Sequence, residues 1–429
     1  MATPLFACGA TALLLAAAAA APTELRVGDV LISRAPQSPG RHAGVVVGGA
    51  VASSSGSSSS SGAGKGLTWT KATLDSTGQA GCLKAISYGP DRVGFIAGEG
   101  GIVLRGAAPA PCDPASGICV PANFSTVLNA GFPNYFYGVY SDGPNVVVSG
   151  FVDDAAGQQG VIRSSGDGGD NFDPQTKQGK VWLGGPIRFT NTTHGVLPPT
   201  SAGKMYATDS GPTASGSQWR EIGGFPSYVG WFAGTFVAPP GSRTPGGPGL
   251  PIVVTGLGLC NSTDAGETYA CRKPVDPVFD GGIALELPAA GSGATTYSGL
   301  GLTGGGAISS PVSGWIHRTL DGGQSWSERE LNAPFPIRWV GIVGEGANAV
   351  AVAAGGDFNA GLGGIYSSSD QGQTWTLDID TGLEMAACDS IEPAPDHAAA
   401  GTVVTLTCVG SARGKTSAVL SANIQTPAV

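Results

Sequence analysis

Charged residues are scarce in this sequence, and most of them are acidic. They make up 12% of the 429 residues, with 22 basic against 31 acidic side chains and a formal net charge of −9. Proteins that bind nucleic acid or anionic lipid through surface charge carry a basic patch or stripe. We therefore expect neither nucleic acid nor a lipid surface among the partners.

Metal and cofactor motifs are missing as well. No Cys-x-x-Cys spacing occurs, and the four histidines, His42, His194, His317 and His397, lie in separate segments. Neither a zinc site nor a Ser-His-Asp triad can be assembled from such spacing. The Gly-rich stretches lie between expected strands with no helix following, which excludes a dinucleotide-binding loop. We expect no metal and no cofactor.

Long hydrophobic runs are confined to residues 1–21, which end in ALLLAAAAAA. We interpret this run as a cleaved secretory signal peptide, with a membrane anchor as the alternative, and no later run approaches the ~20 apolar residues that span a bilayer. Residues 22–66 contain the tract SSSGSSSSSGAGKG. They predict a Ser/Gly-rich linker or a second targeting segment.

Glycine is abundant, with 71 copies against a usual share of roughly 7%. The glycines keep no three-residue register, which excludes collagen, and 41% hydrophobic residues with little charge argue against disorder. Short Val- and Thr-containing stretches punctuated by Gly and Ser predict an all-β chain from residue 67 onward.

Seven cysteines follow the signal segment, and six of them form pairs that are close in sequence. We expect three disulfides, Cys112–Cys119, Cys260–Cys271 and Cys388–Cys408, with Cys82 left over. Three Asn-x-Ser/Thr triplets, at Asn123, Asn191 and Asn261, agree with a glycoprotein in the secretory pathway.

One motif recurs along residues 67–429, with the form Ser/Thr-x-Asp-x-Gly-x-x-aromatic. Asp accepts hydrogen bonds from the turn backbone, Gly supplies a positive φ, and the aromatic ring covers the hairpin, so we assign these residues a structural role. The copies, of which the second is stretched, are Asp167, Gly169 and Phe172; Asp209, Gly211 and Trp219; Asp264, Gly266 and Tyr269; Asp321, Gly323 and Trp326; and Asp370, Gly372 and Trp375.

The motif resembles the Asp box, or BNR repeat, of sialidase-type β-propellers. Seven units of about four strands surround it, with a mean spacing of about 51 residues, typical of four-stranded blades. The inner strands are expected at AISY, YGVY, PIRF, WFAGTF, IALEL, RWVGI and DSIEP, starting at Ala85, Tyr137, Pro186, Trp231, Ile283, Arg338 and Asp389.

The last unit lacks a fourth strand, whereas residues 67–74 (LTWTKATL) precede the first inner strand without a sheet of their own. We therefore predict a seven-bladed β-propeller of antiparallel blades, in which strand 67–74 completes the C-terminal blade and leaves no edge unpaired. Six or eight blades remain alternatives, because the first unit has a degraded box and the middle units are irregular.

The stretches AISYGPDRVGFIAGEGGIVLRG from Ala85 and PIRFTNTTHGVL from Pro186 resemble the repeat of the photosystem II stability and assembly factor family. This resemblance implies a non-catalytic scaffold that binds a protein client, such as a photosystem II subunit, in the thylakoid lumen. It also implies surface arginines as client contacts, for which Arg92, Arg105, Arg188 and Arg338 are the candidates. We expect a monomer, located outside the cell or in a plastid lumen.

A secreted glycan-binding or glycoside-hydrolysing propeller of the sialidase type is the alternative. Sialidases carry an Arg-Ile-Pro motif, which this chain lacks; the nearest string is Pro336-Ile-Arg338. A glycosidase needs two carboxylates about 5 to 10 Å apart. Glu286, Glu392 and Asp153 are candidates, but their spacing selects no pair.

Overall fold

The computed structural model of the protein describes most of residues 67–425 and none of residues 1–66. The described ranges are 67–74, 82–108, 124–189, 193–197, 205–213, 218–222, 233–236, 252–255, 259–262, 268–272, 282–286, 300–307, 312–320, 325–327, 330–343, 349–391, 403–413 and 417–425. The expected signal peptide 1–21, the segment 22–66 and the pair Cys112–Cys119 lie outside them. No described helix is long and apolar enough to cross a membrane.

The described residues form 28 strands arranged in seven four-stranded antiparallel sheets, which we number in chain order. Sheets 1 to 3 contain β2 (Leu83–Tyr88), β3 (Val93–Gly98), β4 (Ile102–Ala107) and β5 (Phe124–Asn129); β6 (Asn134–Ser141), β7 (Val146–Asp154), β8 (Gly157–Ser165) and β9 (Thr176–Lys177); and β10 (Arg188–Phe189), β11 (Gly195–Leu197), β12 (Met205–Thr208) and β13 (Arg220–Ile222).

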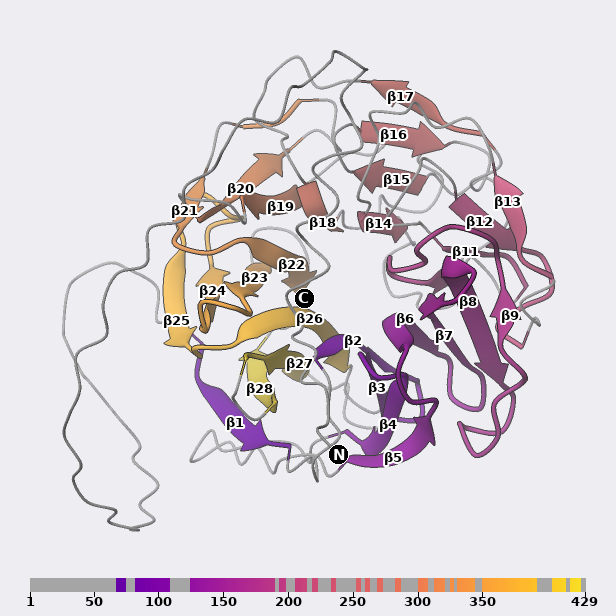
Figure 1. Cartoon of the computed structure of the whole chain (residues 1–429). Helices are drawn as coiled ribbons and strands as arrows, with labels where there is room; N and C mark the ends of the chain where they lie inside the picture. The colour runs from indigo at the N-terminus through magenta and orange to yellow at the C-terminus, as the bar shows by residue number, and fades with distance from the viewer. Residues whose placement is uncertain are drawn as a thin grey trace, which may run out of the picture. The chain divides into compact units, whose positions relative to one another are not determined.

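Sheets 4 to 6 contain β14 (Ala233–Phe236), β15 (Ile252–Thr255), β16 (Leu259–Ser262) and β17 (Ala270–Arg272); β18 (Gly282–Glu286), β19 (Gly301–Ala307), β20 (Ser313–Thr319) and β21 (Leu331–Ala333); and β22 (Ile337–Val343), β23 (Val350–Asp357), β24 (Leu362–Ser368) and β25 (Thr376–Asp380). Sheet 7 contains β26 (Glu384–Ile391), β27 (Val403–Ser411), β28 (Ala418–Gln425) and β1 (Trp69–Thr73). The sheets stand around a common centre as in a β-propeller, with the first strand of each sheet innermost (Figure 1).

Sheet 7 is built from both ends of the described chain. β1 pairs antiparallel with β28, from Trp69 opposite Ala422 to Thr73 opposite Ala418, so the order is β1-β28-β27-β26. The sequence predicts this pairing of β1 with the last sheet, because residues 67–74 precede the first inner strand and the last unit lacks a fourth strand.

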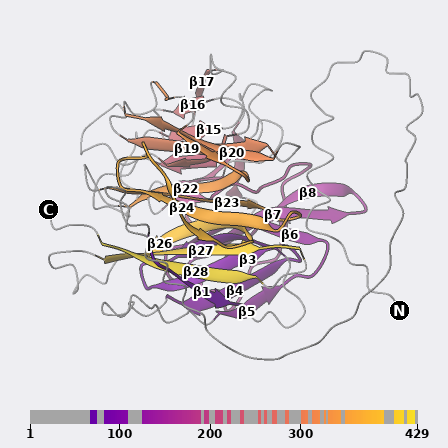
Figure 2. The same cartoon turned by 90° about the vertical axis from the view of Figure 1, so that its left-hand side faces the viewer.

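Sheets 1 and 7 are in direct contact. The backbone N–H of Leu83 donates to Ser411 Oγ at 3.0 Å, and that of Tyr88 donates to Asp389 Oδ2 at 2.7 Å. Both acceptors lie on sheet 7, and both donors lie on β2. Figure 2 shows successive sheets 5, 6 and 7 as layers, and sheet 1 below them.

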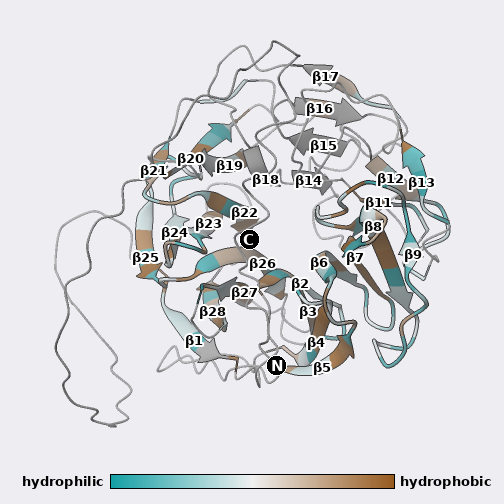
Figure 3. Ribbon diagram, viewed as in Figure 1, coloured by the Kyte–Doolittle hydropathy of each residue, from teal (hydrophilic) through white to brown (hydrophobic). Residues whose placement is uncertain are grey.

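The apolar core lies between neighbouring sheets. One buried cluster joins Leu83 and Ile96 of sheet 1 to Ile391, Val409 and Val419 of sheet 7. Strands such as β4 and β7 carry apolar stretches, whereas the inner strands β6 and β26 also bear polar residues (Figure 3). Because the cores lie between sheets, each sheet depends on its neighbours for burial.

One inner-strand expectation needs correction. The last inner strand begins at Glu384, five residues before the expected Asp389. The sequence MAACD carries no alternation that separates it from a loop.

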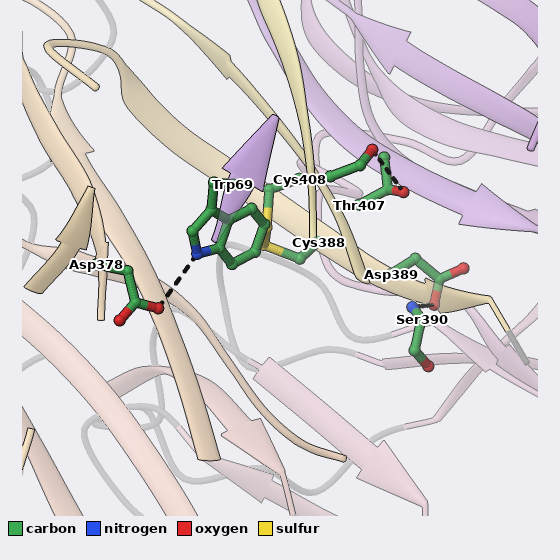
Figure 4. Close-up of a disulfide and its surroundings, with 8 residues drawn as sticks. Trp69, Asp378, Cys388, Asp389, Ser390, Thr407 and Cys408 are labelled. Carbon is green, nitrogen blue, oxygen red and sulfur yellow. Dashed lines mark hydrogen bonds between the residues drawn. A yellow bond between two sulfur atoms is a disulfide. The ribbon is translucent and has the colours of Figure 1, made fainter. Parts of the chain in front are cut away.

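A disulfide joins the two innermost strands of sheet 7. Cys388 on β26 lies directly opposite Cys408 on β27, and their sulfur atoms are bonded (Figure 4). On the outer side of the same sheet, the Trp69 indole donates to Asp378 Oδ2 on sheet 6 at 3.2 Å. β1 is thus attached to a neighbouring sheet as well as to β28.

Candidate functional site

Five of the seven innermost strands carry a β-bulge near their first residues. In β2, β6 and β22 the extra residues are Lys84, Tyr137 and Arg338, each skipped by the pairing register with the second strand. A bulge re-aims the side chain of the extra residue and is common beside functional sites. Equivalent bulges occur at Ile283 in β18 and Ala386 in β26.

A glycine on the second strand accompanies the bulge. Residues Leu83, Phe136, Ile337 and Met385, which precede the bulges or lie next to them, pair with Gly98, Gly150, Gly355 and Gly410. A Cβ at Gly98 would lie 2.7 Å from the Cys82 carbonyl oxygen, and one at Gly410 would lie 3.0 Å from that of Glu384. The bulged inner strand therefore requires glycine at this position, which explains part of the glycine excess.

The bulge residues take part in a buried network that we call the ion cluster: Lys84, Glu99, Tyr137, Arg338 and Glu384. Lys84 Nζ lies 3.8 Å from Glu99 Oε1 and 3.5 Å from Glu384 Oε2. Arg338 Nε lies 3.0 Å from Glu384 Oε1, and the Tyr137 hydroxyl donates to Glu99 Oε1 at 3.2 Å. These five residues belong to four consecutive sheets, 6, 7, 1 and 2.

The two carboxyl groups of the ion cluster differ in electrostatics. Burial raises the pKa of Glu99, although Lys84 and the Tyr137 hydrogen bond act against it. Burial also disfavours the charged form of Glu384, but Lys84 and Arg338 outweigh it and hold the pKa of Glu384 below its usual value. Burial and the Glu99 carboxylate raise the pKa of Tyr137 well above its usual value, so Tyr137 stays a hydrogen-bond donor.

Aromatic rings on sheet 2 and on the segments flanking it form a second group next to the ion cluster, which we call the aromatic row: Phe132, Tyr135, Phe151 and Trp182. Phe151 stacks on Tyr135 and Trp182 with ring centroids 4.7 and 4.8 Å apart, and on Tyr137 of the ion cluster at 5.8 Å. Phe132 meets Tyr135 edge to face at 5.9 Å. Phe151 is buried, whereas 61% of Phe132 is exposed.

Carboxylates border the aromatic row. Glu99 forms an isolated β-bridge with Tyr135, and Asp153 on β7 is exposed, with its backbone N–H donating to the Pro133 carbonyl at 3.1 Å. Burial, with Glu99 and then Asp153 adding to it, raises the pKa of Tyr135. The row is therefore an aromatic surface with the exposed carboxylate of Asp153 at its edge.

The four arginines expected to contact a client do not gather in one place in the structure. Arg338 belongs to the ion cluster, and Arg188 lies on the inner strand of sheet 3. Arg92 lies in the β2–β3 turn with a φ of 63°. Arg105 on β4 donates to the Gly168 carbonyl at 2.7 Å and pairs with Asp170 at 2.6 Å, which ties sheet 1 to a turn of sheet 2.

The repeated turn motif has the expected local geometry in its two fully described regular copies. Asp370 Oδ1 accepts hydrogen bonds from Ser368 Oγ at 2.7 Å and from the N–H of Thr374 at 2.9 Å, and Gly372 has a φ of 80°. In the other copy, hydrogen bonds from Asn171 and then Ser165 lower the pKa of Asp167 to about 2. Gly169 has a φ of 86°, and Phe172 packs on a core shared by sheets 1 and 2.

The stretched copy is built differently. Asp209 Oδ1 lies 2.6 Å from His194 Nδ1, and this contact is the main cause of its lowered pKa. Gly211 has a φ of 80°, and Trp219 is buried in a core with sheet 2. In the remaining copies only the aromatic residues, Tyr269 and Trp326, are described, while Asp264, Gly266, Asp321 and Gly323 lie outside the described residues.

The sequence suggested that Cys82 is left without a partner, but in the structure Cys82 is disulfide-bonded. It is buried at the start of β2, and its nearest cysteine along the chain is Cys112. Pairing cysteines by closeness in sequence misses a bond that the fold makes over a longer range. Cys260 is also disulfide-bonded, and the strand register places Cys271 directly opposite it.

The carboxylates named as glycosidase candidates do not form a described pair. Asp153 lies at the edge of the aromatic row, Glu286 ends β18, and Glu392 lies outside the described residues. Within the described residues, no group of three His, Cys, Asp or Glu could hold a metal ion. His194 contacts Asp209, and His317 Nδ1 lies 3.0 Å from the Ser327 carbonyl oxygen.

Sequence reasoning missed Lys84, Glu99, Tyr137 and Glu384, and it found Arg338 only as a surface contact. The signal was present, because LKA, FYG and IRW place Lys84, Tyr137 and Arg338 at the same position of the repeat. It requires knowledge of the bulge, since a regular inner strand would give this position no special direction.

No family model matches the chain, and no curated protein matches it. It is similar to the solved structures of YCF48 bound to a D1 peptide (TM-score 0.47, 14% identity, 82% of this chain and 94% of that one) and of YCF48 from Cyanidioschyzon merolae (0.45, 13%, 82% and 98%). It is also similar to the GH74 enzyme of Niastella koreensis (0.45, 14%, 79% and 59%). Likenesses this distant support no argument about function.

Proposed function

We propose that the protein is a non-catalytic scaffold that binds a protein client at the aromatic row. The observation that carries this proposal is the row itself, in which an exposed ring at Phe132 leads into rings stacked on a buried one. Aromatic side chains dominate the energetics of protein interfaces because they lose little conformational entropy on binding. The ion cluster beneath the row holds its supporting strands in place.

We further propose that the scaffold is a complete seven-bladed Asp-box propeller. The seven four-stranded sheets, the pairing of β1 with β28 and the hydrogen bonds between sheets 1 and 7 support it. A ring without free edges is a rigid platform, which suits a client-binding role.

The compartment is proposed to be oxidising, reached through the secretory pathway. The disulfide-bonded states of Cys82, Cys260, Cys388 and Cys408 support it, because disulfides persist mainly in such compartments. Extracellular space and a thylakoid lumen both fit, and in the lumen the resemblance to photosystem II assembly factors makes a photosystem II subunit the client. Sequencing the mature N-terminus of a tagged chain, together with its localisation, tests this proposal.

Glycoside hydrolysis is the second candidate function, and one observation favours it. Glu99 and Glu384 both lie within 3.8 Å of Lys84 Nζ, and their pKa values are shifted in opposite directions, the pattern of an acid and its partner carboxylate. Against it, Glu384 is buried between two cations and Glu99 is held by Lys84 and Tyr137. Both carboxylates are thus engaged by side chains of the ion cluster.

A peptide display selection against the full disulfide-intact chain tests the scaffold proposal, and a panel of fluorogenic glycosides tests the alternative. We expect selected peptides whose binding is lost in Phe132→Ala, and no hydrolysis. Turnover that is lost in Glu99→Gln, with Asp380→Asn as the matched control on sheet 6, would establish the glycosidase and overturn the scaffold.

A further inference from the structure

We propose that the aromatic row binds an extended protein segment that carries lysine or arginine next to an apolar residue. This inference rests on the proposed scaffold function and adds the chemistry of the partner. It differs from the expectation of arginine contacts on this chain, which implies an acidic client.

The apolar part of the surface is centred on Phe132. Its ring is 61% exposed, and the edge-to-face contact with Tyr135 leaves it projecting at the end of the row. A Cβ on Gly100 would lie only 3.4 Å from the Phe132 ring, so the ring rests on the backbone of sheet 1. An apolar partner residue placed against Phe132 removes area from water that the fold leaves exposed.

The charge at this surface is negative. Asp153 is exposed, and its described side-chain contact is with Gln158 Nε2 at 3.5 Å. No described cation lies within ion-pair distance of Asp153. Lys84 and Arg338 balance the carboxylates of Glu99 and Glu384 within the ion cluster, so the net negative charge at this surface comes from Asp153.

The aromatic rings also favour a positively charged partner. An aromatic face attracts an ammonium or guanidinium group through its quadrupole, and Lys84 lies 5.9 Å from the Tyr137 ring centroid. Trp182 extends the stack on the other side of Phe151, and its indole donates to Gln158 Oε1 at 2.7 Å. Gln158 thus connects Trp182 to Asp153, so that an aromatic ring and a carboxylate are available to a single bound cation.

The probe for the test is a fluorescein-labelled peptide of alternating arginine and leucine. Its matched partner has citrulline, a neutral side chain of nearly the same shape, in place of every arginine. Fluorescence anisotropy at low salt measures binding of both peptides to the full chain with its disulfides intact. We expect the arginine peptide to bind about tenfold more tightly than the citrulline peptide, from a few exposed ion-pair and cation–π contacts.

Variants locate the site. Asp153→Asn is expected to weaken binding of the arginine peptide about threefold and to leave binding of the citrulline peptide unchanged, since one exposed ion pair is lost. Phe132→Ala is expected to weaken both peptides about tenfold through the loss of apolar contact. Asp380→Asn and Leu377→Ala, which alter exposed residues of sheet 6, are the controls and are expected to change neither.

The outcomes separate the inference from the proposed function. Equal binding of the two peptides, or equal effects of Asp153→Asn and Asp380→Asn, overturns the basic-partner inference. If display selects acidic or uncharged peptides that Phe132→Ala no longer binds, the scaffold stands and the partner chemistry is wrong. If neither probe binds and display selects nothing, the scaffold proposal fails as well.

Discussion

Replacing Gly356 by alanine tests how sheets 6 and 7 are held against each other. Gly356 lies on β23, and a Cβ there would lie 2.5 Å from Glu384 Cα, 2.6 Å from the Leu362 carbonyl oxygen and 2.9 Å from that of Leu383. Carbon atoms pack at about 3.5 to 4.0 Å, so Glu384 must retreat by roughly 1 Å. All three obstacles are main-chain atoms, which cannot rotate away.

The cost follows from two effects and one opposing gain. Overpacking of this kind costs about 1 to 3 kcal/mol, and disturbance of the buried contacts of Glu384 with Lys84 and Arg338 adds to it. Replacing a strand glycine by alanine stabilises the folded state by about 0.5 to 1 kcal/mol, because alanine loses less conformational entropy on folding. We expect Gly356→Ala to lower the free energy of unfolding by about 3 kcal/mol.

Urea denaturation followed by tryptophan fluorescence measures the loss. Gly166→Ala is the matched control, because a Cβ there meets only Thr213 Cγ2 at 3.4 Å, and its free energy is expected to change by less than about 0.5 kcal/mol. If both variants unfold at the same urea concentration with the same slope, main-chain contact between the sheets is not the reason for glycine at position 356.

Three further predictions concern other contacts. Burial raises the pKa of Asp378, despite hydrogen bonds from Ser367 and Trp69. The folded state therefore holds the Asp378 proton more tightly than the unfolded state does. The stability that the protonated carboxyl contributes is lost as the pH rises above its usual pKa of 3.8. Asp378→Asn should gain stability over the wild type between pH 4 and pH 7 in urea titrations, whereas Asp380→Asn should not. The lowered pKa of Asp167 acts with the opposite sign, so its stabilisation is present above about 3.8 and is lost as pH falls toward about 2; Asp167→Asn should flatten the acid limb of thermal unfolding over that window, and an unchanged limb would contradict the hydrogen-bond assignment. The double variant Cys388→Ala, Cys408→Ala opens a loop with a sequence separation of 20 residues, and its free energy of unfolding in urea should fall by about 3 kcal/mol relative to the oxidised wild type. The reduced wild type is the control, and its loss of free energy should equal that of the double variant if this disulfide dominates.

The strand content and sheet order could be predicted because they follow from local signals. Apolar stretches separated by the repeated turn motif mark most strands, and the missing fourth strand of the last unit points to residues 67–74. Strands made of small residues, such as β19 with three consecutive glycines, carry no such signal, since their partners in neighbouring sheets determine their position.

The site could not be predicted in the same way. Lys84, Glu99 and Glu384 are separated by up to 300 residues and meet only because sheet 7 packs on sheet 1. The aromatic row combines rings from the turn before β6, from β6, from β7 and from the connection to sheet 3. The glycines opposite the bulges were visible in the sequence, but their role depends on carbonyl groups that approach them in the folded chain.

The pairing of β1 with β28 also determines the order of events when the chain is made. Trp69 is synthesised among the first residues of the sheets, and its partner Ala422 among the last, so β1 has to wait through the synthesis of six other sheets. Contacts between such distant segments form slowly, and until they form the outer edge of β28 is open to any extended chain nearby. If β1 of a second copy occupies that edge during the interval, the product is a strand-exchanged pair of chains.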